Sequence, residues 1–281
     1  MIRLKVVERY SPTLLESNRA FSFINFASIG SFLQQPHSLA CFCDGMLMSG
    51  FMSYVTGIPV QRVSFDFTSI ADPVFRDAEL KGKRMYVVGA RHAELELFIA
   101  KLQERYPHLT IAGAHHGYFN ASQARAVQAD IRRSRVNILL VGLGAGLQER
   151  FVLDAVREGF DGVAFTCGGF IRQEATTTGC YYPEAIDRLH LRAFYRMYRE
   201  PRTIKRYLVD YPSNFLQLAG MILRHKVAID ITAPKAPGKD HAYPVRSEGL
   251  HPRRRCRVCA ETPGGAVSQG RPTRQSIRHE R

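Results

Sequence analysis

Between residues 84 and 166, short apolar runs alternate with longer segments of helical periodicity. Apolar runs of about four to six residues bounded by glycine are typical of buried strands, and spacings of i, i+3, i+4 and i+7 mark one face of a helix. The apolar runs cover residues 84–88, 109–112, 136–141 and 162–166. Strands that alternate with helices form βαβ units. We therefore expect an α/β fold with a Rossmann-like, mostly parallel sheet flanked by helices.

A glycine-rich turn follows the strand expected at 136–141, and a helix is expected to begin near Leu147. In a parallel sheet such a turn lies at the carboxyl end of a strand, where ligands bind. Glycine lets the backbone approach a ligand closely, and a helix N-terminus favours an anion such as a diphosphate. Alternatively, the glycines only make the turn. The candidate ligand-facing residues are Gly142, Gly144, Gln148 and Glu149.

Asp44 occupies a comparable position earlier in the chain. An apolar run at 39–43 predicts a strand, and apolar residues at 48, 51, 52 and 55 predict a helix that ends at Gly57. Asp44 lies between the two elements, so it serves either as a helix cap or as a catalytic carboxylate. Position alone supports both roles equally. A strand that runs into a helix is expected at 21–33, around Asn25, and a short strand at 62–66 with a helix to Leu80.

The character of the chain changes after Thr166. Residues 167–172 and 176–183 are expected to be loops, and a basic amphipathic helix is expected from about Glu184. Pro201 and Pro212 each predict the start of a further helix, because proline favours the first helical turn. This segment has two alternative interpretations: it docks on the core, or it binds to a membrane surface. Its excess of arginine favours the membrane.

The formal net charge of +14 is unevenly distributed. Residues 1–180 contain 19 basic and 16 acidic side chains, whereas residues 234–281 contain 11 and 4. The latter segment is rich in Pro, Gly, Arg and Ser, which is typical of disorder. We therefore expect a catalytic core at 1–180, a basic helical appendage at 181–233 and a disordered basic tail at 234–281. Such asymmetry indicates an anionic partner.

Several classes of protein are not favoured by the composition. No apolar run approaches the ~18 residues of a membrane span, and the first residues lack a secretory signal. Six scattered cysteines in such a chain favour reduced thiols in the cytosol. Cys256 and Cys259, with His251 nearby, lack the second pair of a zinc site. We expect no metal.

Several motifs together resemble the WecG/TagA/CpsF family of bacterial glycosyltransferases. Cys43-Asp-Gly-Met46 and Arg62-Val-x-x-Asp66 are similar to two of its acidic elements, and Val141-Gly-Leu-Gly-x-x-x-Gln-Glu149 is similar to its Gln-Glu segment. The family's middle section is similar to 106–113 and to Gly117-Tyr-Phe119. Its basic C-terminal signature resembles Tyr195-Arg196, Glu200-Pro-Arg202 and Arg206-Tyr207. The matches lie in order across residues 20–220.

The resemblance implies a cytosolic enzyme bound peripherally to the inner face of the membrane. It implies transfer of a sugar, with inversion, from a UDP-sugar to an undecaprenyl-diphosphate-linked acceptor during surface-polysaccharide assembly, without a metal or other cofactor. Asp44 is then the general base, and Arg62 and Gln148 orient the nucleotide sugar. The implied site also contains Asn25, Asp66, Gly142, Gly144 and Glu149. The cations that would balance the departing diphosphate are Arg196, Arg202 and Arg206.

The chain departs from the family pattern at several positions. Phe23-Ile-Asn25 keeps the Asn of a Thr-x-Asn element but lacks its hydroxyl, and Gln173-Glu174 replaces an Ala-Pro pair. Two other functions are weighed. An NAD(P)-dependent oxidoreductase would use the glycine turn, but the spacing and late position are wrong for a dinucleotide fingerprint. A nucleic-acid-binding protein would use the basic tail, and we do not favour it. The sequence does not determine the oligomeric state and is compatible with a homo-oligomer.

Overall fold

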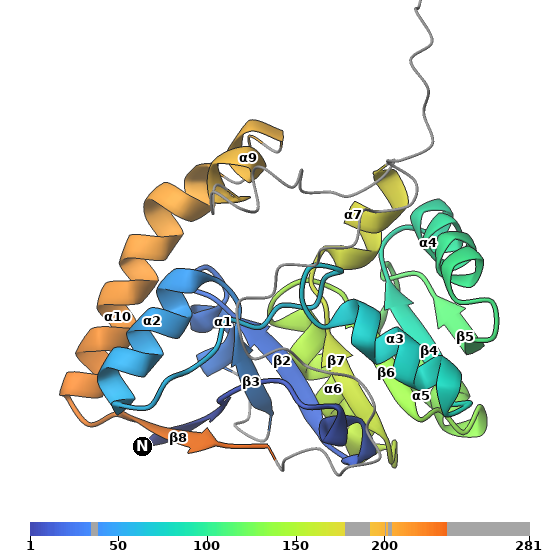
Figure 1. The fold of residues 1–281 in the computed structure, drawn as a ribbon, viewed down its shortest axis with the longest axis horizontal. Coiled ribbons are helices and arrows are strands. Elements are labelled where there is room, and N and C mark those ends of the chain that lie inside the picture. The colour runs from blue at the N-terminus through green and yellow to red at the C-terminus, as the bar shows by residue number, and fades with distance from the viewer. Residues whose placement is uncertain (35–38, 178–191, 200, 202–203, 235–281) are drawn as a thin grey trace, which may run out of the picture. The chain divides into compact units, whose positions relative to one another are not determined.

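The computed structural model describes residues 1–34, 39–177, 192–199, 201 and 204–234. All of these described residues belong to one unit. The unit contains an eight-stranded sheet with the order β5-β4-β6-β7-β2-β3-β1-β8. Every strand pair in it is parallel (Figure 1). The expectation of a Rossmann-like α/β fold is confirmed.

The strands are short, as the apolar runs predict. Their bounds are β1 (Ile2–Val7), β2 (Ala20–Ile24), β3 (Ala40–Cys43), β4 (Arg84–Gly89), β5 (Thr110–His115), β6 (Ile138–Gly142), β7 (Val163–Thr166) and β8 (Val227–Thr232). In the central strand β6, residues 138–141 are fully buried. Alternate residues of that run face the two different hydrophobic cores, so an uninterrupted apolar run is needed there.

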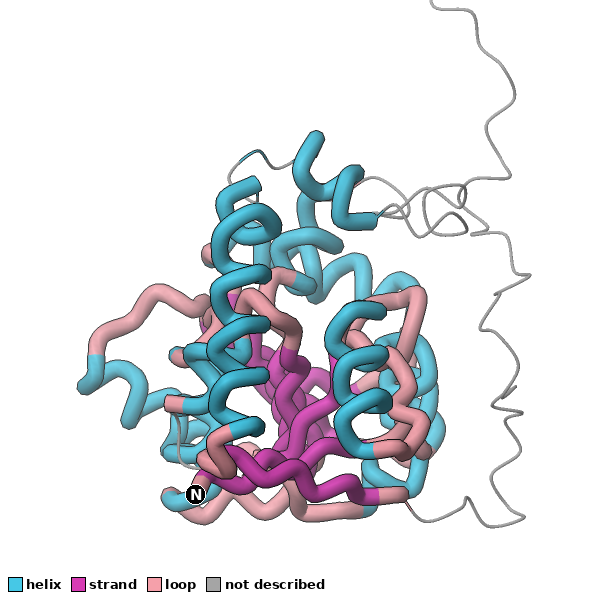
Figure 2. Tube along the Cα trace, turned by 90° about the vertical axis from the view of Figure 1, so that its left-hand side faces the viewer, coloured by secondary structure: helices cyan, strands magenta, loops and turns pink. Residues whose placement is uncertain are grey.

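Helices cover both faces of the sheet (Figure 2). One core is covered by α1 (Ile29–Leu33), α2 (Met46–Thr56), α5 (Ala121–Arg133), α6 (Leu147–Arg157) and α10 (Tyr211–Leu223). The other is covered by the 3-10 helix η1 (Pro12–Glu16), α3 (Ala71–Leu80), α4 (His92–Arg105) and α7 (Phe170–Thr176). The remaining helices are α9 (Arg192–Arg199) and the π-helical turn η3 (Arg206–Asp210).

Two local expectations are wrong, and one expected strand is longer than predicted. Residues 62–66 form no strand, because only Arg62 pairs with β3, through an isolated bridge to Cys43. Residues 170–176, expected in part as loop, form α7, which buries Phe170 and Ile171 in the second core. The strand expected at 109–112 extends to His115, because β5 pairs with β4 as far as Val88.

The chain returns to the sheet after its last helix. β8 pairs with β1 over six residues, from Ile2 with Val227 to Val7 with Thr232. Neither strand was expected from the sequence. Residues 227–232 of the expected appendage therefore belong to the same sheet as the core. The boundary expected at 180 lies outside the described residues, as does the tail expected at 234–281 apart from Pro234, and the domain boundaries stay predictions.

The strand order indicates the edge of the sheet where a ligand would bind. β2 and β7 are neighbours, and from this pair the chain continues to β3 on one side and arrives from β6 on the other. In a parallel sheet, ligands bind outside the carboxyl ends of the strands at such a switch point. Asn25 and Asp44 follow β2 and β3 directly, whereas Gly142 ends β6 and Cys167 follows β7. This edge is the candidate site.

Candidate active site

Asp44 lies at the carboxyl end of β3 and does not cap α2. Its backbone N–H donates to Ile24 O at 2.8 Å, which fixes it beside β2. The residue that caps α2 is Gly45, whose φ of 99° favours glycine, and no side chain bonds to the helix start. The Asp44 side chain is half-buried. Since the cap role is removed, a carboxylate with access to solvent is left at the edge of the sheet.

Asn25 orients Asp44. Its Nδ2 donates to Asp44 Oδ2 at 3.3 Å, the one side-chain hydrogen bond to that carboxylate from the part of the chain that the structure describes. Its Oδ1 accepts from the N–H groups of Ala27 and Ser28 at 3.0 and 3.2 Å. Asn25 is 6% exposed. The amide is therefore held in one orientation, with its donor toward Asp44.

Arg206 reaches the same site from a distant part of the sequence. Its Nη2 donates to Asn25 Oδ1 at 3.2 Å. Its Nε is buried and makes no hydrogen bond. An arginine has five N–H donors in a planar fork, and Asn25 is the one described side chain that accepts from Arg206, so donors remain for an anion beside Asn25 and Asp44. Of the three arginines expected to balance the diphosphate, Arg206 is placed at the site. The side chain of Arg196 and all of Arg202 lie outside the described residues.

An aromatic cluster seats α10 against the core and so places Arg206. Phe215 of α10 meets Phe26 and Phe51 edge-on, with ring centroids 5.4 and 5.3 Å apart. Asn214 Nδ2 donates to Phe26 O at 2.7 Å. A Cβ atom on Gly30 of α1 would lie 3.2 Å from Asn214 Oδ1, so this contact is close. The docking of α10 on α1 and α2 is therefore specific.

The Arg62 side chain interacts with residues of its own loop. Its backbone follows β3 through the bridge to Cys43. Its Nη2 donates to Ser64 Oγ at 2.8 Å and lies 3.7 Å from Asp66 Oδ2. Ser64 Oγ donates to Asp66 Oδ2 at 2.7 Å, and Asp66 Oδ1 accepts from Thr68 N at 2.9 Å. Arg62 and Asp66 thus shape the loop beside Asp44. Their contact with a nucleotide sugar stays a prediction.

The glycine turn has the conformation that the sequence requires. Gly144 and Gly146 have φ values of 86° and 87°, in the left-handed region that glycine favours. A Cβ atom on Gly142 would lie 2.9 Å from the carbonyl oxygen of Gly168, so the β6 turn packs closely on the β7 turn. The helix α6 begins at Leu147, as predicted.

Gln148 and Glu149 are buried, although the sequence led us to expect both to face the crevice. They are 5% and 2% exposed. Glu149 Oε1 accepts from Ser22 Oγ at 2.7 Å and from Gln148 Nε2 at 2.9 Å, and Oε2 accepts from Gly146 N at 2.6 Å. Gln148 Oε1 accepts from Gly168 N at 3.1 Å. The pair joins β2, the glycine turn and the β7 turn.

The sequence did not indicate two further polar residues of this network. Thr166 Oγ1 at the end of β7 donates to Ser22 Oγ at 3.1 Å, and Ser22 Oγ in turn donates to Glu149 Oε1. Both residues have no exposed surface. A hydroxyl residue within or at the end of an apolar strand is the signal that would have found them, because a buried hydroxyl needs a partner.

Burial changes the pKa of two groups near the site. Burial, with a smaller contribution from Asp44, raises the pKa of the Cys43 thiol to about 12, so it carries no thiolate at neutral pH. Glu174 of α7, also not indicated as a site residue, has its pKa raised to about 7 by burial and then by the negative charge of Asp66. Across the described residues no group of three or more His, Cys, Asp or Glu could hold a metal ion.

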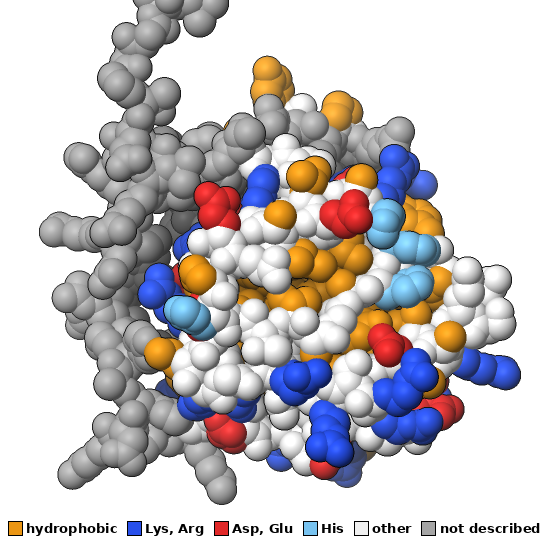
Figure 3. Space-filling view, turned by 90° about the vertical axis from the view of Figure 1, so that its right-hand side faces the viewer, with side chains coloured by type: hydrophobic (Ala, Val, Ile, Leu, Met, Phe, Trp, Pro, Cys, Tyr) orange, Lys and Arg blue, Asp and Glu red, His pale blue; other side chains and the backbone are white. Residues whose placement is uncertain are grey.

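Histidines gather on the face beside α4 and β5, next to exposed hydrophobic side chains (Figure 3). The rings of His115 and His116 are 4.4 Å apart, and His116 meets His92 edge-on at 6.2 Å. His115 ends the edge strand β5, His116 directly precedes the Gly117-Tyr-Phe119 motif, and His92 begins α4. They belong to the opposite end of the sheet from β3, so they are not part of the Asp44 cluster.

The described helices at the C-terminal end carry exposed apolar side chains. None of the helices in the described ranges is long and apolar enough to cross a membrane. Large apolar side chains are nevertheless exposed there by 40% or more. They are Phe194, Tyr198, Ile204, Leu208, Val209, Phe215, Leu216 and Leu223.

Comparison with known proteins agrees with the motifs. The profile of the glycosyl transferase WecG/TagA/CpsF family matches residues 31–228. A UDP-Gal:alpha-D-GlcNAc-diphosphoundecaprenol beta-1,4-galactosyltransferase of Shigella boydii is 28% identical over 205 residues, which are 71% of this chain and 86% of the relative. An N-acetylglucosaminyldiphosphoundecaprenol N-acetyl-beta-D-mannosaminyltransferase of Bacillus subtilis (strain 168) is 28% identical over 175 residues, 60% of this chain and 62% of the relative.

The family profile spans β3 to β7, the glycine turn and the π-helical turn that carries Arg206. This match favours a glycosyltransferase over a nicotinamide-dependent oxidoreductase. The chain belongs to the WecG/TagA/CpsF family and is a glycosyltransferase.

Proposed function

We propose that the protein transfers a sugar from a UDP-sugar to a polyprenyl-diphosphate-linked acceptor in bacterial polysaccharide synthesis, with inversion at the anomeric carbon. Two relatives are named for acceptors of diphosphoundecaprenol type, and one is named for a UDP-sugar donor. The observation that carries the proposal is the Arg206–Asn25–Asp44 cluster, which holds a cation and an accessible carboxylate together at the edge of the sheet.

In this proposal Asp44 is the general base. A half-buried carboxylate with free lone pairs can accept the proton of the acceptor hydroxyl as the oxygen attacks the anomeric carbon. The bond from that carbon to the diphosphate oxygen breaks, and UDP leaves with the electron pair. Asn25 holds Asp44 in place through its amide donor. The proton then passes from Asp44 to solvent.

Cationic and backbone donors balance the diphosphates. Arg206 has unused N–H groups beside Asn25, and a guanidinium fork fits phosphate oxygens. The turn 142–146 and the start of α6 would receive the nucleotide, since a helix N-terminus favours an anion. Gln148 and Glu149 support this turn from beneath. The reaction is proposed to need no metal, and turnover in excess chelator tests that point.

The test is UDP release with a lipid-linked acceptor and a panel of UDP-sugars. We expect one UDP-sugar to be turned over by the wild type and Asp44→Asn to lower kcat by at least about a thousandfold, in line with the loss of a general base and its orientation. Asp154→Asn, on the exposed part of α6, is the matched control and should keep full turnover. Wild-type turnover by Asp44→Asn would remove the proposed role of Asp44.

We propose that the protein acts at the inner, cytoplasmic face of the membrane and is bound peripherally there. The exposed apolar side chains of η3 and α10, with the basic residues of the same segment, suit an anionic lipid surface. Leu208→Asp should weaken sedimentation with anionic vesicles, whereas Leu80→Asp on α3 should not, although Leu208 and Leu80 are 68% and 66% exposed. Equal vesicle binding by both variants would contradict the proposed surface.

A further inference from the structure

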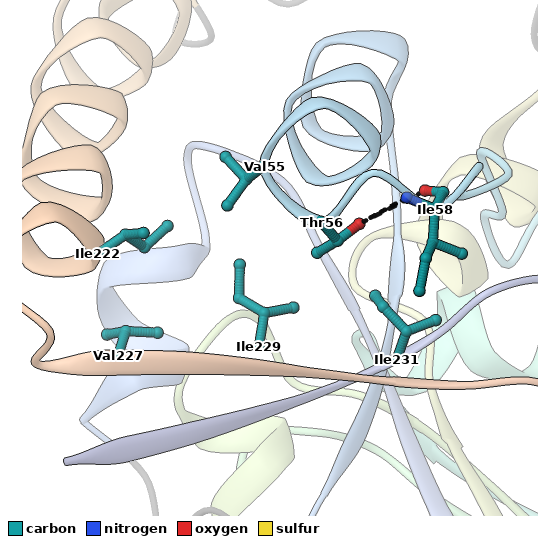
Figure 4. A pocket seen from close by; sticks show the side chains of 7 residues that line it. All are labelled: Val55, Thr56, Ile58, Ile222, Val227, Ile229 and Ile231. Atoms are coloured by element: carbon teal, nitrogen blue, oxygen red, sulfur yellow. Dashed lines mark hydrogen bonds between the residues drawn. The ribbon is translucent and has the colours of Figure 1, made fainter.

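An apolar groove lies between α2, α10 and β8 (Figure 4). Its volume is about 290 Å³, and seven residues line it: Val55, Thr56, Ile58, Ile222, Val227, Ile229 and Ile231. The three β8 side chains alternate along the strand and so share one face, with the end of α2 on one side of the groove and the end of α10 on another. Val55 and Ile58 are 37% and 41% exposed. Six aliphatic side chains therefore form a concave surface that water can reach.

The polar groups of the groove are already satisfied. Thr56 Oγ1 donates to Met52 O at 2.7 Å within α2. The backbone N–H of Ile58 donates to Thr56 Oγ1 at 3.3 Å. No described charged side chain lines the groove. A surface of this kind has few hydrogen-bond partners for a sugar or a phosphate. Covering it with a hydrocarbon ligand is favourable, because apolar surface is removed from water.

Two helices connect the groove to the candidate active site. α2 begins two residues after Asp44 and ends beside the groove, and its 11 residues span about 16 Å. α10 follows η3, which carries Arg206, and its 13 residues span about 20 Å to the same groove. Both helices thus have one end at the charged cluster and the other end at the apolar lining.

We propose that this groove binds part of the isoprenoid chain of the lipid-linked acceptor. The proposal rests on the proposed function, which places the acceptor hydroxyl at Asp44 and its diphosphate near Arg206. The chain would then extend along α2 and α10. Exposed apolar side chains, Leu47 and Tyr54 on α2 and Leu216 on α10, lie along these helices between the site and the groove.

The chain's own C-terminal residues match the groove poorly as occupants. Residues 235–281 follow β8, but they are rich in Pro, Gly, Arg and Ser and contain few large aliphatic residues. An aliphatic lining without charged residues provides no ion-pair or hydrogen-bond partner for an arginine side chain. A hydrocarbon chain of branched five-carbon units matches the branched side chains of valine and isoleucine in polarity and shape.

Photolabelling of the full-length protein tests the proposal independently of turnover. The probe is an isoprenyl diphosphate that carries a benzophenone on its chain, with labelled peptides identified by mass spectrometry. We expect labels on peptides that contain Val55–Ile58 or residues 227–231, and at least about fivefold less label with excess polyprenyl phosphate. Labels confined to other peptides would overturn the proposal. So would labels at the groove only after residues 235–281 are deleted, because the tail would then be the occupant.

A double variant provides the matched comparison. Val55→Ser with Ile58→Ser should lower groove labelling and raise KM for a long-chain acceptor about three- to tenfold, because two hydrocarbon contacts are lost. KM for a short-chain acceptor should not change. Leu97→Ser on α4, where Leu97 is 53% exposed, should affect neither quantity. Equal changes for both acceptors would contradict the groove.

Failure of the groove and failure of the proposed function give different results. Groove labelling without transfer to any lipid-linked acceptor would support the proposed groove and contradict the proposed function. Transfer that is independent of chain length, with no label at the groove, would support the proposed function and contradict the proposed groove. Thermal unfolding within about 2 °C of wild type shows that the double variant is folded, as expected for two side chains already more than one third exposed.

Discussion

Two carboxylates at the same edge of the sheet have opposite environments. Asp44 is half-buried and receives one side-chain hydrogen bond of 3.3 Å among the described residues. Glu149 is 2% exposed and receives three hydrogen bonds of 2.6–2.9 Å. A carboxylate must have free lone pairs and access to substrate to accept a proton. A buried carboxylate whose oxygens already accept hydrogen bonds from the protein can only stabilise the fold.

The same difference separates the two halves of this edge of the sheet. On the β6–β7 side, Glu149 and Gln148 tie together three segments that are distant in sequence. On the β2–β3 side, Asp44 depends on Asn25, which also bonds to Arg206 from the C-terminal part of the chain. One side is a fixed frame, and the other carries the groups with unused donors and acceptors. The changes below test this division, from the largest expected effect to the smallest.

Glu149→Gln should lower the free energy of unfolding by about 3 kcal/mol, because an amide cannot accept all three hydrogen bonds and leaves buried donors unmatched. Urea unfolding measures the change. Glu158→Gln, exposed at the end of the same helix, is the control and should change stability by less than about 0.5 kcal/mol. A loss below about 1 kcal/mol for Glu149→Gln would show that the frame does not depend on this carboxylate.

Arg206→Ala should raise KM for the lipid-linked acceptor about tenfold or more, since a charge-assisted phosphate contact is worth about 1.5–3 kcal/mol. Arg206→Lys should recover part of the loss, because lysine keeps the charge but lacks the fork. Initial rates against acceptor concentration measure both. Arg157→Ala, an exposed residue of α6, is the comparison. An unchanged acceptor KM in Arg206→Ala would place the diphosphate elsewhere.

Glu174 should make stability depend on pH. Its pKa is raised to about 7 in the folded protein from 4.5, by burial and by Asp66. The folded state therefore binds this proton more tightly, so the stability contribution is present below about pH 4.5 and is lost as pH rises to about 7. Glu174→Gln should reduce the loss between pH 5 and 7.5 by about 1–2 kcal/mol. Identical pH profiles of the variant and wild type in urea unfolding would contradict the raised pKa.

Ser22→Ala should cost about 1 kcal/mol, because it removes one donor to Glu149 and the acceptor of Thr166. The double variant with Glu149→Gln should cost less than the sum of the two single changes, since both act on one hydrogen bond. Strict additivity in the unfolding free energies would indicate that Ser22 does not act through Glu149.

The sequence predicted the alternating strands because β4, β6 and β7 are buried on both faces and therefore read as apolar runs. It did not indicate β1 and β8, in which Arg3, Lys5 and Asp230 interrupt the apolar residues near one end of the sheet. The hydrogen bond between Asn25 and Asp44 was not expected either. It depends on β2 and β3 being adjacent, which no local pattern records.

The role of Glu149 could not be read from local sequence. A glutamate in the first turn of a helix is usually exposed, and its burial depends on Ser22, 127 residues earlier, and on the β7 turn. The same holds for Arg206, which meets Asn25 across 181 residues. Motif spacing located the candidate residues. Only the packing of the strands distinguishes the carboxylate left accessible from the one enclosed.

The most direct test of this division is a paired measurement of kcat and thermal midpoint for Asp44→Asn and Glu149→Gln. We expect Asp44→Asn to lose at least about a thousandfold in kcat with a midpoint within about 2 °C of wild type. We expect Glu149→Gln to lower the midpoint by about 5 °C or more while the folded fraction keeps measurable turnover. The reverse result, with Asp44→Asn destabilised but active and Glu149→Gln stable but inactive, would contradict the account.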